Sequence, residues 1–162
     1  MTYDRYMTDI AKPEAPARPL SASCRPPALA GDLRLSLTHL VRRLRLERSS
    51  EQITDGQYAT LATLANRGPM TPTALAEDQH VQPPPMTRTV NALAEAGLVR
   101  RDDHPTDRRQ VVVSLTEAGL REVKETRRRR NAWLAGQLAT LNPQEREVLA
   151  QASVLLGRIA NG

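Results

Sequence analysis

Three consecutive prolines at residues 83–85 constrain the fold of this chain more than any other feature of its sequence. Proline disrupts a helix interior, but it fits the first turn, where its missing N–H costs no hydrogen bond. Met86, Val90 and Leu93 then recur at helical spacing, and Gly97 is a typical residue for the end of a helix. We therefore expect a helix that opens in the prolines and buries these three side chains.

A second short helix is expected directly before the prolines. Thr71 is a good N-cap, Pro72 suits the first helical position, and Leu75 and Ala76 share one side of a helix that ends near Gln79. Two short helices joined by a tight turn form a helix-turn-helix, and Thr, Arg and Asn can reach phosphates and base edges. The residues expected to face DNA from the second helix and its start are Gln82, Pro84, Pro85, Thr87, Arg88 and Asn91.

The hydrophobic period changes after the second helix. Residues 98–101 and 110–115 predict two short strands, and the intervening loop is rich in Asp and contains Pro. A two-stranded wing of this kind can lie along a minor groove, so Asp107, Arg108 and Arg109 are expected to contact DNA. The alternative is that Asp107 and Arg109 only stiffen the hairpin.

Residues 94–120 resemble the wing signature of the MarR family, the multiple-antibiotic-resistance type of transcriptional regulator. The matching pieces are Gly97-Leu98-Val99, the Asp-x-Arg of Asp107 and Arg109, and Leu115-Thr116 followed by Gly119. The resemblance covers about residues 30–160. Its departure from the family pattern is at the prolines, where members more often carry Ser, Gln or Thr. With fewer hydroxyls at the start of this helix, fewer phosphate contacts are expected.

The resemblance implies a winged helix-turn-helix regulator of transcription, of the repressor type, that binds double-stranded DNA as a homodimer. In that family the first, fifth and sixth helices build the dimer, and relatives often release DNA when they bind small aromatic acids. A small aromatic effector is therefore expected, with His39, Arg43 and Tyr58 as the polar lining of its pocket. Ordinary packing and surface roles are the alternative for these three residues.

Two helices outside the winged region carry more apolar surface than a single helix can bury alone. The first is capped by Asp32, runs to about Ser49 and has the apolar stripe Leu33, Leu37, Leu40, Val41 and Leu44. The last is capped by Asn142, with Glu145 in the capping-box position. Its apolar residues are Val148, Leu149, Ala152, Leu155, Leu156 and Ile159. Together these stripes predict a helical dimer interface.

The expected fold class is mainly α with a small two-stranded β-wing, a winged helix-turn-helix plus a helical dimerisation region. Residues 1–28 are expected to form a flexible Pro-rich tail, and residues 29–162 a single domain. Within that domain the winged helix-turn-helix is expected at about 54–116. The dimerisation helices are expected at about 29–49 and 117–160.

Two further N-caps bound the winged region. A capping box at residues 54–57 begins a bracing helix, and Thr116 caps a long helix after the wing. That long helix carries four consecutive arginines at residues 127–130. Two interpretations of the run carry equal weight: a solvated surface paired with Glu122 and Glu125, or a basic shoulder towards DNA phosphates.

Composition narrows the function further. The chain has 162 residues and a net charge of +5, which favours a polyanionic partner. No stretch approaches the roughly 20 apolar residues that cross a bilayer, and the single cysteine, Cys24, suits a reducing compartment, so we expect a cytoplasmic protein. Cys24 is interpreted as an incidental thiol, with a redox role as the alternative.

The sequence argues against an enzyme. It contains only three histidines, and it lacks a Gly-rich phosphate loop and a ligand-spaced metal cluster, so no cofactor is expected. Two alternatives to an effector-controlled regulator stay open. One is a winged helix that binds proteins, and the other is a DNA-binding protein without an effector.

Overall fold

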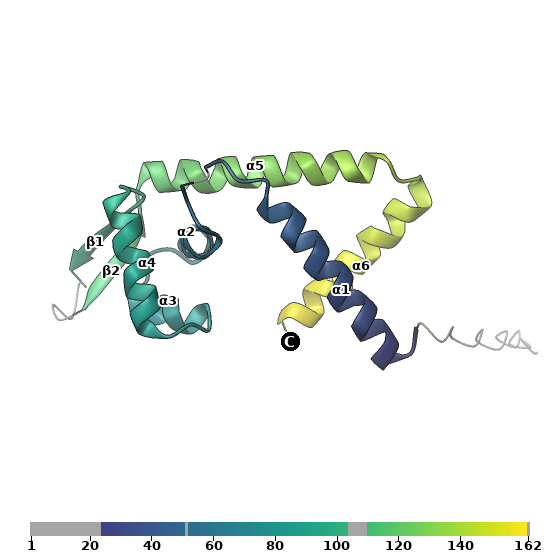
Figure 1. Ribbon diagram of the computed structural model, residues 1–162, viewed down its shortest axis with the longest axis horizontal. Helices are drawn as coiled ribbons and strands as arrows, with labels where there is room; N and C mark the ends of the chain where they lie inside the picture. Colours follow the sequence, from purple (N-terminus) through teal and green to yellow (C-terminus); the bar gives the residue numbers. More distant parts are fainter. Residues whose placement is uncertain (1–23, 51, 104–109, 162) are drawn as a thin grey trace, which may run out of the picture. The chain divides into compact units, whose positions relative to one another are not determined.

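The computed structural model describes residues 24–50, 52–103 and 110–161, with residue 161 described by its backbone only. Within them the chain separates into two compact units between His39 and Leu40. The elements, shown in Figure 1, are α1 (Pro26–Arg45), α2 (Asp55–Arg67), α3 (Pro72–Asp78), α4 (Pro83–Glu95), β1 (Val99–Asp103), β2 (Val111–Leu115), α5 (Glu117–Ala139) and α6 (Pro143–Asn161). This is the mainly α architecture with a two-stranded wing that the sequence predicts.

Helix α1 begins earlier than expected. Asp32 was predicted to cap it, but the helix already starts at Pro26, and the boundary expected for the tail at residue 28 falls inside it. The physical reason is the pair Pro26-Pro27, because two prolines fit the first turn of a helix and set its φ angles. The helix also ends at Arg45, short of the expected Ser49.

The other helix starts follow the predicted caps. Thr54 and Gln57 form a complete capping box, and the Thr71 hydroxyl accepts from the Ala74 backbone N–H at 3.2 Å. Asn142 and Glu145 form a second box, with both bonds at 2.9 Å. Helix α4 has no side-chain cap at Gln82 and opens instead with its prolines.

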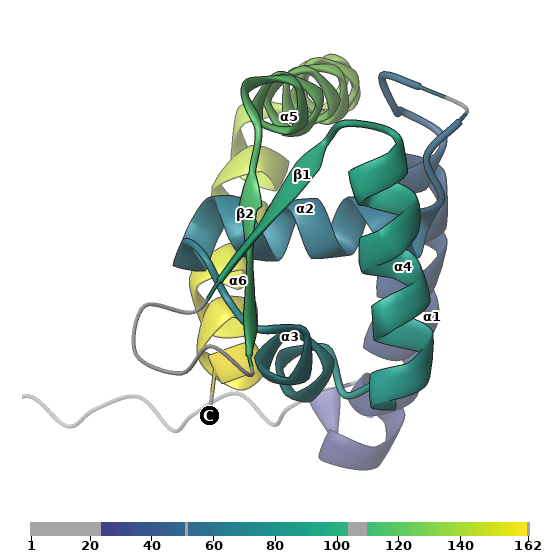
Figure 2. The ribbon, with the colours of Figure 1, turned by 90° about the vertical axis from the view of Figure 1, so that its left-hand side faces the viewer.

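The winged lobe, defined as α2, α3, α4, β1 and β2, surrounds one apolar core (Figure 2). Its fully enclosed side chains include Leu61, Leu75, Val90, Leu93 and Val113, each at most 1% exposed. Val123 of α5 closes the same core. A polar contact also joins α5 to the segment between α1 and α2, because the buried Thr126 hydroxyl binds both the backbone N–H and the hydroxyl of Ser49.

The wing is an antiparallel pair in which Val99 faces Leu115 and Asp103 faces Val111. Strand β1 extends two residues beyond the expected Arg101. Asp102 supports this extension, because its carboxylate accepts from Arg100 Nε at 2.9 Å and from the Ser114 hydroxyl at 3.3 Å.

One hydroxyl joins the wing to both neighbouring helices. Thr116 Oγ1 donates to the carbonyl oxygen of Gly97, just after α4, at 2.7 Å, and accepts from the Gly119 backbone N–H in α5 at 3.1 Å. Gly97 has a positive φ of 70°, a conformation that glycine adopts at little cost. His80, in the turn between α3 and α4, takes a similar φ of 51° without being glycine.

Candidate nucleic-acid interface

Helix α4 has one buried face and one exposed face. Met86, Val90 and Leu93 are 2%, 1% and 1% exposed, so the predicted apolar side packs into the core. The six residues expected to face DNA are all exposed: Gln82, Pro84, Pro85, Thr87, Arg88 and Asn91. The structure thus leaves all six accessible. Pro84, Thr87, Arg88 and Asn91 share the face of α4 away from the core, whereas Gln82 precedes the helix and Pro85 lies to the side of that face.

The polar side chains of this face differ in what they already contact. The Thr87 hydroxyl donates to the Pro83 carbonyl oxygen at 3.1 Å, a bond within the helix. Asn91 Oδ1 accepts from Arg101 Nη1 at 2.7 Å. Arg88 makes no hydrogen bond or ion pair with any residue that the structure describes. Its guanidinium therefore has its full donor capacity for an external acceptor.

A hollow of about 540 Å³ lies beside Thr87, between α3, α4 and the wing. Thr71, Thr73 and Glu77 line it from α3, and Arg101 lines it from β1. Its position next to the exposed face of α4 extends that face into a surface with polar groups from three elements.

The wing residues Asp107, Arg108 and Arg109 lie outside the described residues, and their expected contact with DNA rests on the sequence. The described part of the wing adds two arginines that sequence reasoning did not single out. Arg100 binds Asp102 and Ser114, and Arg101 binds Asn91. Strand alternation would have placed them on opposite faces, but no local pattern indicates the bond from Arg101 to a helix.

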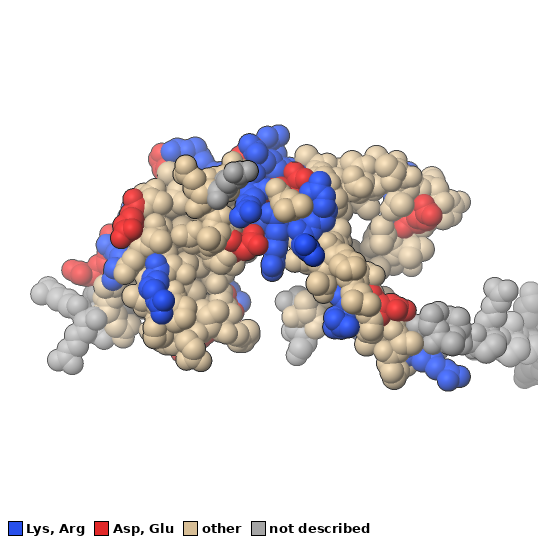
Figure 3. All heavy atoms as spheres, in the orientation of Figure 1, with Lys and Arg blue, Asp and Glu red and all other residues tan. Residues whose placement is uncertain are grey.

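Lys and Arg side chains gather around the middle of α5 (Figure 3). Arg128 donates twice to Glu125 at 2.8 Å, and Arg129 Nε donates to the same carboxylate at 2.9 Å. These two guanidinium groups, Arg128 first, lower the pKa of Glu125 to about 2, and the carboxylate raises the pKa of Arg128. Arg127 is also engaged, by Asn66 Oδ1 at 2.8 Å. Arg127, Arg128 and Arg129 therefore bind acceptors of the protein itself, and the expected pairing with Glu125 is found. Glu122 pairs with no arginine that the structure describes and contacts Ser49 and Thr126 instead.

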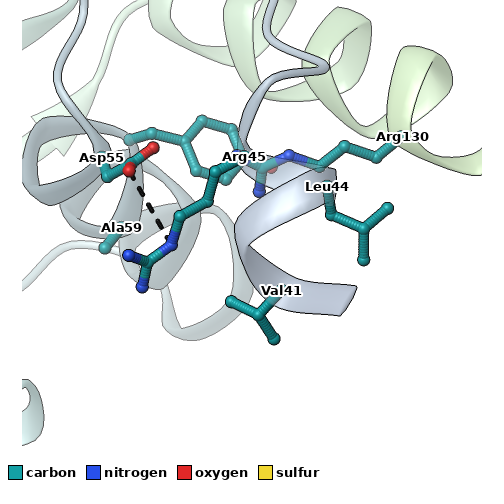
Figure 4. A pocket seen from close by; sticks show the side chains of 7 residues that line it. Val41, Leu44, Arg45, Asp55, Ala59 and Arg130 are labelled. Atoms are coloured by element: carbon teal, nitrogen blue, oxygen red, sulfur yellow. Dashed lines mark ion pairs between the residues drawn. The ribbon is translucent and has the colours of Figure 1, made fainter. Parts of the chain in front are cut away.

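A pocket of about 330 Å³ lies between the end of α1, α2 and α5 (Figure 4). Its charged lining is Arg45, Asp55 and Arg130, with Arg45 Nε 3.7 Å from Asp55 Oδ2. Arg130 stacks over the ring of Tyr58, with its guanidinium carbon 4.2 Å from the ring centroid. Asp55 Oδ1 and Arg130 Nε are buried and have no hydrogen-bond partner within the described chain. The pocket therefore holds an acceptor and a donor that no described residue satisfies.

Of the three residues predicted for an effector pocket, Tyr58 lines this one. Arg43 is engaged elsewhere, over the Trp133 ring at 4.7 Å and with Glu47 at 2.8 Å. His39 is exposed on α1 and belongs to the first compact unit. Sequence reasoning missed Arg45, Asp55 and Arg130 as lining, because the contact between these parts of the chain is tertiary.

The remaining groups of the described chain give no comparable indication of a functional site. Cys24 is exposed at the start of α1. Over residues 24–50, 52–103 and 110–161, no cluster of three or more His, Cys, Asp or Glu side chains has a geometry that could hold a metal ion. None of the helices in this part of the chain is long and apolar enough to cross a membrane.

The lobe and its exposed helix face define a winged helix-turn-helix of the DNA-binding class. The model of the MarR family matches residues 53–111. The HTH-type transcriptional regulator MT0903.1 of Mycobacterium tuberculosis is 48% identical over 128 residues, which cover 79% of this chain and 90% of that protein. The chain belongs to the MarR family, and it is a DNA-binding regulator of transcription.

Two further likenesses agree with this assignment. The HTH-type transcriptional repressor MdtR of Bacillus subtilis is 29% identical over 136 residues, with 82% of this chain and 86% of that protein covered. The crystal structure of RV1404 from Mycobacterium tuberculosis superposes with a TM-score of 0.75 at 30% identity, over 86% of this chain and 97% of that one. The fold predicted from the sequence is thereby confirmed.

Proposed function

We propose that this protein is a homodimeric, cytoplasmic repressor that reads an inverted-repeat operator with α4 in the major groove and the wing in the minor groove. The observation that carries the proposal is the exposed face of α4, where Arg88 has no partner among the described residues. An exposed arginine beside Thr and Asn on a helix-turn-helix fits the recognition of guanine and phosphate. The repressor role is supported by the similarity to MdtR.

The dimer is supported by the surface of α6. On one face of this helix, Val148, Leu155 and Ile159 are 64%, 54% and 73% exposed in the single chain. Leaving large apolar side chains in water forfeits about 25 cal/mol for each Å² of apolar surface that could be buried. On α1, Leu35, Leu40 and Val41 are exposed as well. A two-fold dimer that covers these helices would present two copies of α4 to DNA about one helical turn apart.

The first test is selection of bound sequences from a random duplex pool by the wild-type protein. Inverted half-sites spaced by about 10 base pairs are the expected result, and selected sequences without inverted symmetry would contradict the proposal. Binding of random duplexes at several salt concentrations tests the alternative of a protein-interaction module, because a module of that kind gives little affinity and no salt dependence.

The second test compares the two parts of the interface on the selected operator. Arg88→Ala is expected to cost about 1–3 kcal/mol and to relax preference at one position in each half-site. Arg109→Ala is expected to weaken binding to most duplexes and to reduce the dependence of affinity on salt. Thermal unfolding checks that both variants fold. If folded Arg109→Ala keeps the wild-type dependence of affinity on salt concentration, the wing is only a structural hairpin and does not contact DNA.

The pocket at Tyr58 supports a small aromatic acid as effector. Its apolar side chains suit a ring, and the buried Arg130 Nε suits a carboxylate. An inducer must bind the DNA-incompetent state better than the competent one. Phenolic and aromatic acids are therefore screened for loss of operator affinity with wild-type protein and Arg130→Met. Arg127→Met is the matched control, because Arg127 contacts Asn66 instead. If no acid changes operator affinity, the regulator without an effector is the correct alternative.

A further inference from the structure

Arg101 is the one described wing residue whose side chain binds the exposed face of α4. It lies in the middle of β1, where its backbone pairs with Val113, a residue with no exposed surface. Its Nη1 reaches Asn91 Oδ1 at 2.7 Å, a short charge-assisted hydrogen bond. A side chain on a paired strand therefore holds a side chain that the proposed function places against DNA.

The chemistry of the pair settles which way the Asn91 amide is turned. An arginine only donates hydrogen bonds, so the atom facing Arg101 must be the amide oxygen rather than the nitrogen. The amide nitrogen keeps its two N–H donors, and no described residue accepts from them. Both N–H groups of the Asn91 amide can therefore donate to DNA, while its oxygen already accepts a hydrogen bond from the Arg101 guanidinium.

The base edges in the major groove differ in what they offer to such a donor. Guanine presents two acceptors, O6 and N7, whereas cytosine presents only the N4 donor. Asparagine with a free amide reads adenine through one accepted and one donated bond. An amide whose oxygen is held by Arg101 is better matched to an edge that accepts.

We propose that Arg101 is a positioning residue, which holds the Asn91 amide so that it donates to DNA and thereby sets a preference for guanine over cytosine at the base that Asn91 meets. This inference rests on the proposed function, since it requires α4 to lie in the major groove. Arg101 acts through Asn91, and its effect on base preference therefore depends on Asn91 being present.

The test is a double-mutant cycle on the preferences of the selected operator. Wild-type protein is expected to favour guanine over cytosine at the Asn91 position by on the order of tenfold. Arg101→Ala should reduce that ratio to about twofold or less, and should leave it unchanged in an Asn91→Ala background. Arg100→Ala is the matched control. It removes a positive charge from the same strand, but the Arg100 side chain binds Asp102 and Ser114 and not Asn91.

A second measurement examines the free protein. The side-chain amide signals of Asn91 in a ¹⁵N–¹H NMR spectrum should shift in Arg101→Ala and stay in place in Arg100→Ala. Thermal unfolding shows whether each variant folds.

Three results would overturn the inference. Arg101→Ala could weaken binding to all duplexes by the same factor and to the same extent as Arg100→Ala. In that case Arg101 only contacts phosphates. If Arg101→Ala changes the base preference equally without Asn91, Arg101 reads the base itself. If wild-type protein prefers no sequence, the proposed function fails, and the inference fails with it.

Discussion

The winged lobe and helix α6 bury their apolar residues to opposite degrees. Leu61, Leu75 and Val113 of the lobe have no exposed surface, whereas Val148 and Ile159 of α6 are 64% and 73% exposed. The lobe closes its core with residues of a single chain. Helix α6 is amphipathic, and large apolar residues of its sequence stay exposed in the single chain. In the proposed dimer, the two regions would draw their stability from different sources, the lobe from its own core and α6 from association.

The strongest test of this difference charges the exposed face of α6. Leu155→Glu combined with Leu156→Glu should abolish association and folding together at micromolar concentration, because carboxylates would be buried in an apolar interface. Sedimentation and circular dichroism measure the two effects. Ala150→Glu, on another side of the same helix, is the control and should keep the wild-type state. Wild-type protein that is a well-folded monomer at micromolar concentration would contradict the dimer.

The next test weakens the lobe itself. Leu61→Ala should lower the free energy of unfolding by about 2–5 kcal/mol, because it removes a fully enclosed side chain and leaves a cavity. Chemical unfolding at several protein concentrations separates the two regions. The loss from Leu61→Ala should be the same at each concentration, while Ile159→Ala should make the melting temperature depend more steeply on concentration. If the stability of both variants depends on protein concentration to the same extent, the lobe and α6 do not differ in their dependence on association.

A third test probes the contact between α5 and the lobe. A Cβ added at Gly119 would overlap the backbone carbonyl oxygen of Leu98, and backbone cannot move aside as a side chain can. Gly119→Ala should therefore cost about 1–3 kcal/mol of stability, measured by thermal unfolding. Gly136→Ala, in the same helix with open space around it, should be neutral or slightly stabilising. A Gly119→Ala protein as stable as wild type would show that α5 is loosely attached.

The smallest effect is expected at Glu125, on the part of α5 outside the lobe core. Its pKa is lowered to about 2 by Arg128 and Arg129, so its contribution to stability is present above the ordinary value of 4.5 and is lost as the pH falls towards 2. An NMR titration of the Glu125 carboxyl measures this midpoint. Arg128→Ala should raise it, and Arg121→Ala should leave it unchanged. An ordinary midpoint in wild-type protein would mean that the ion pairs do not persist in solution.

Local chemistry allowed much of the fold to be predicted from the sequence. Thr54, Thr71, Thr116 and Asn142 act as N-caps because a cap depends only on residues within three or four positions. The two faces of α4 follow from helical period for the same reason. The sequence does not indicate the start of α1, because Asp32 is a good N-cap by residue type and two prolines at residues 26 and 27 equally suit an extended tail.

The site was harder to predict wherever it depends on tertiary contact. Arg101 and Asn91 are 10 residues apart, on a strand and a helix that meet only after the lobe has folded. Arg127 and Asn66 are 61 residues apart, and the run of arginines gave no sign of which acceptors would hold it. Arg130 likewise stacks on Tyr58 from a different helix. Residue type indicated a basic surface here, but not the pairing of individual side chains.

The hydroxyl of Thr116 gives α5 a mechanical role. It donates to the backbone just after α4 and caps the first turn of α5, so two hydrogen bonds connect the end of α4 to the start of α5. In the proposed dimer, α5 would connect the winged lobe at its first turn to α6, which follows its last turn. A tilt of α5 in that dimer would move the attached lobe and so change the distance between the two copies of α4. Thr116→Val should uncouple α4 from α5, leaving the fold in place while blunting any signal carried along α5.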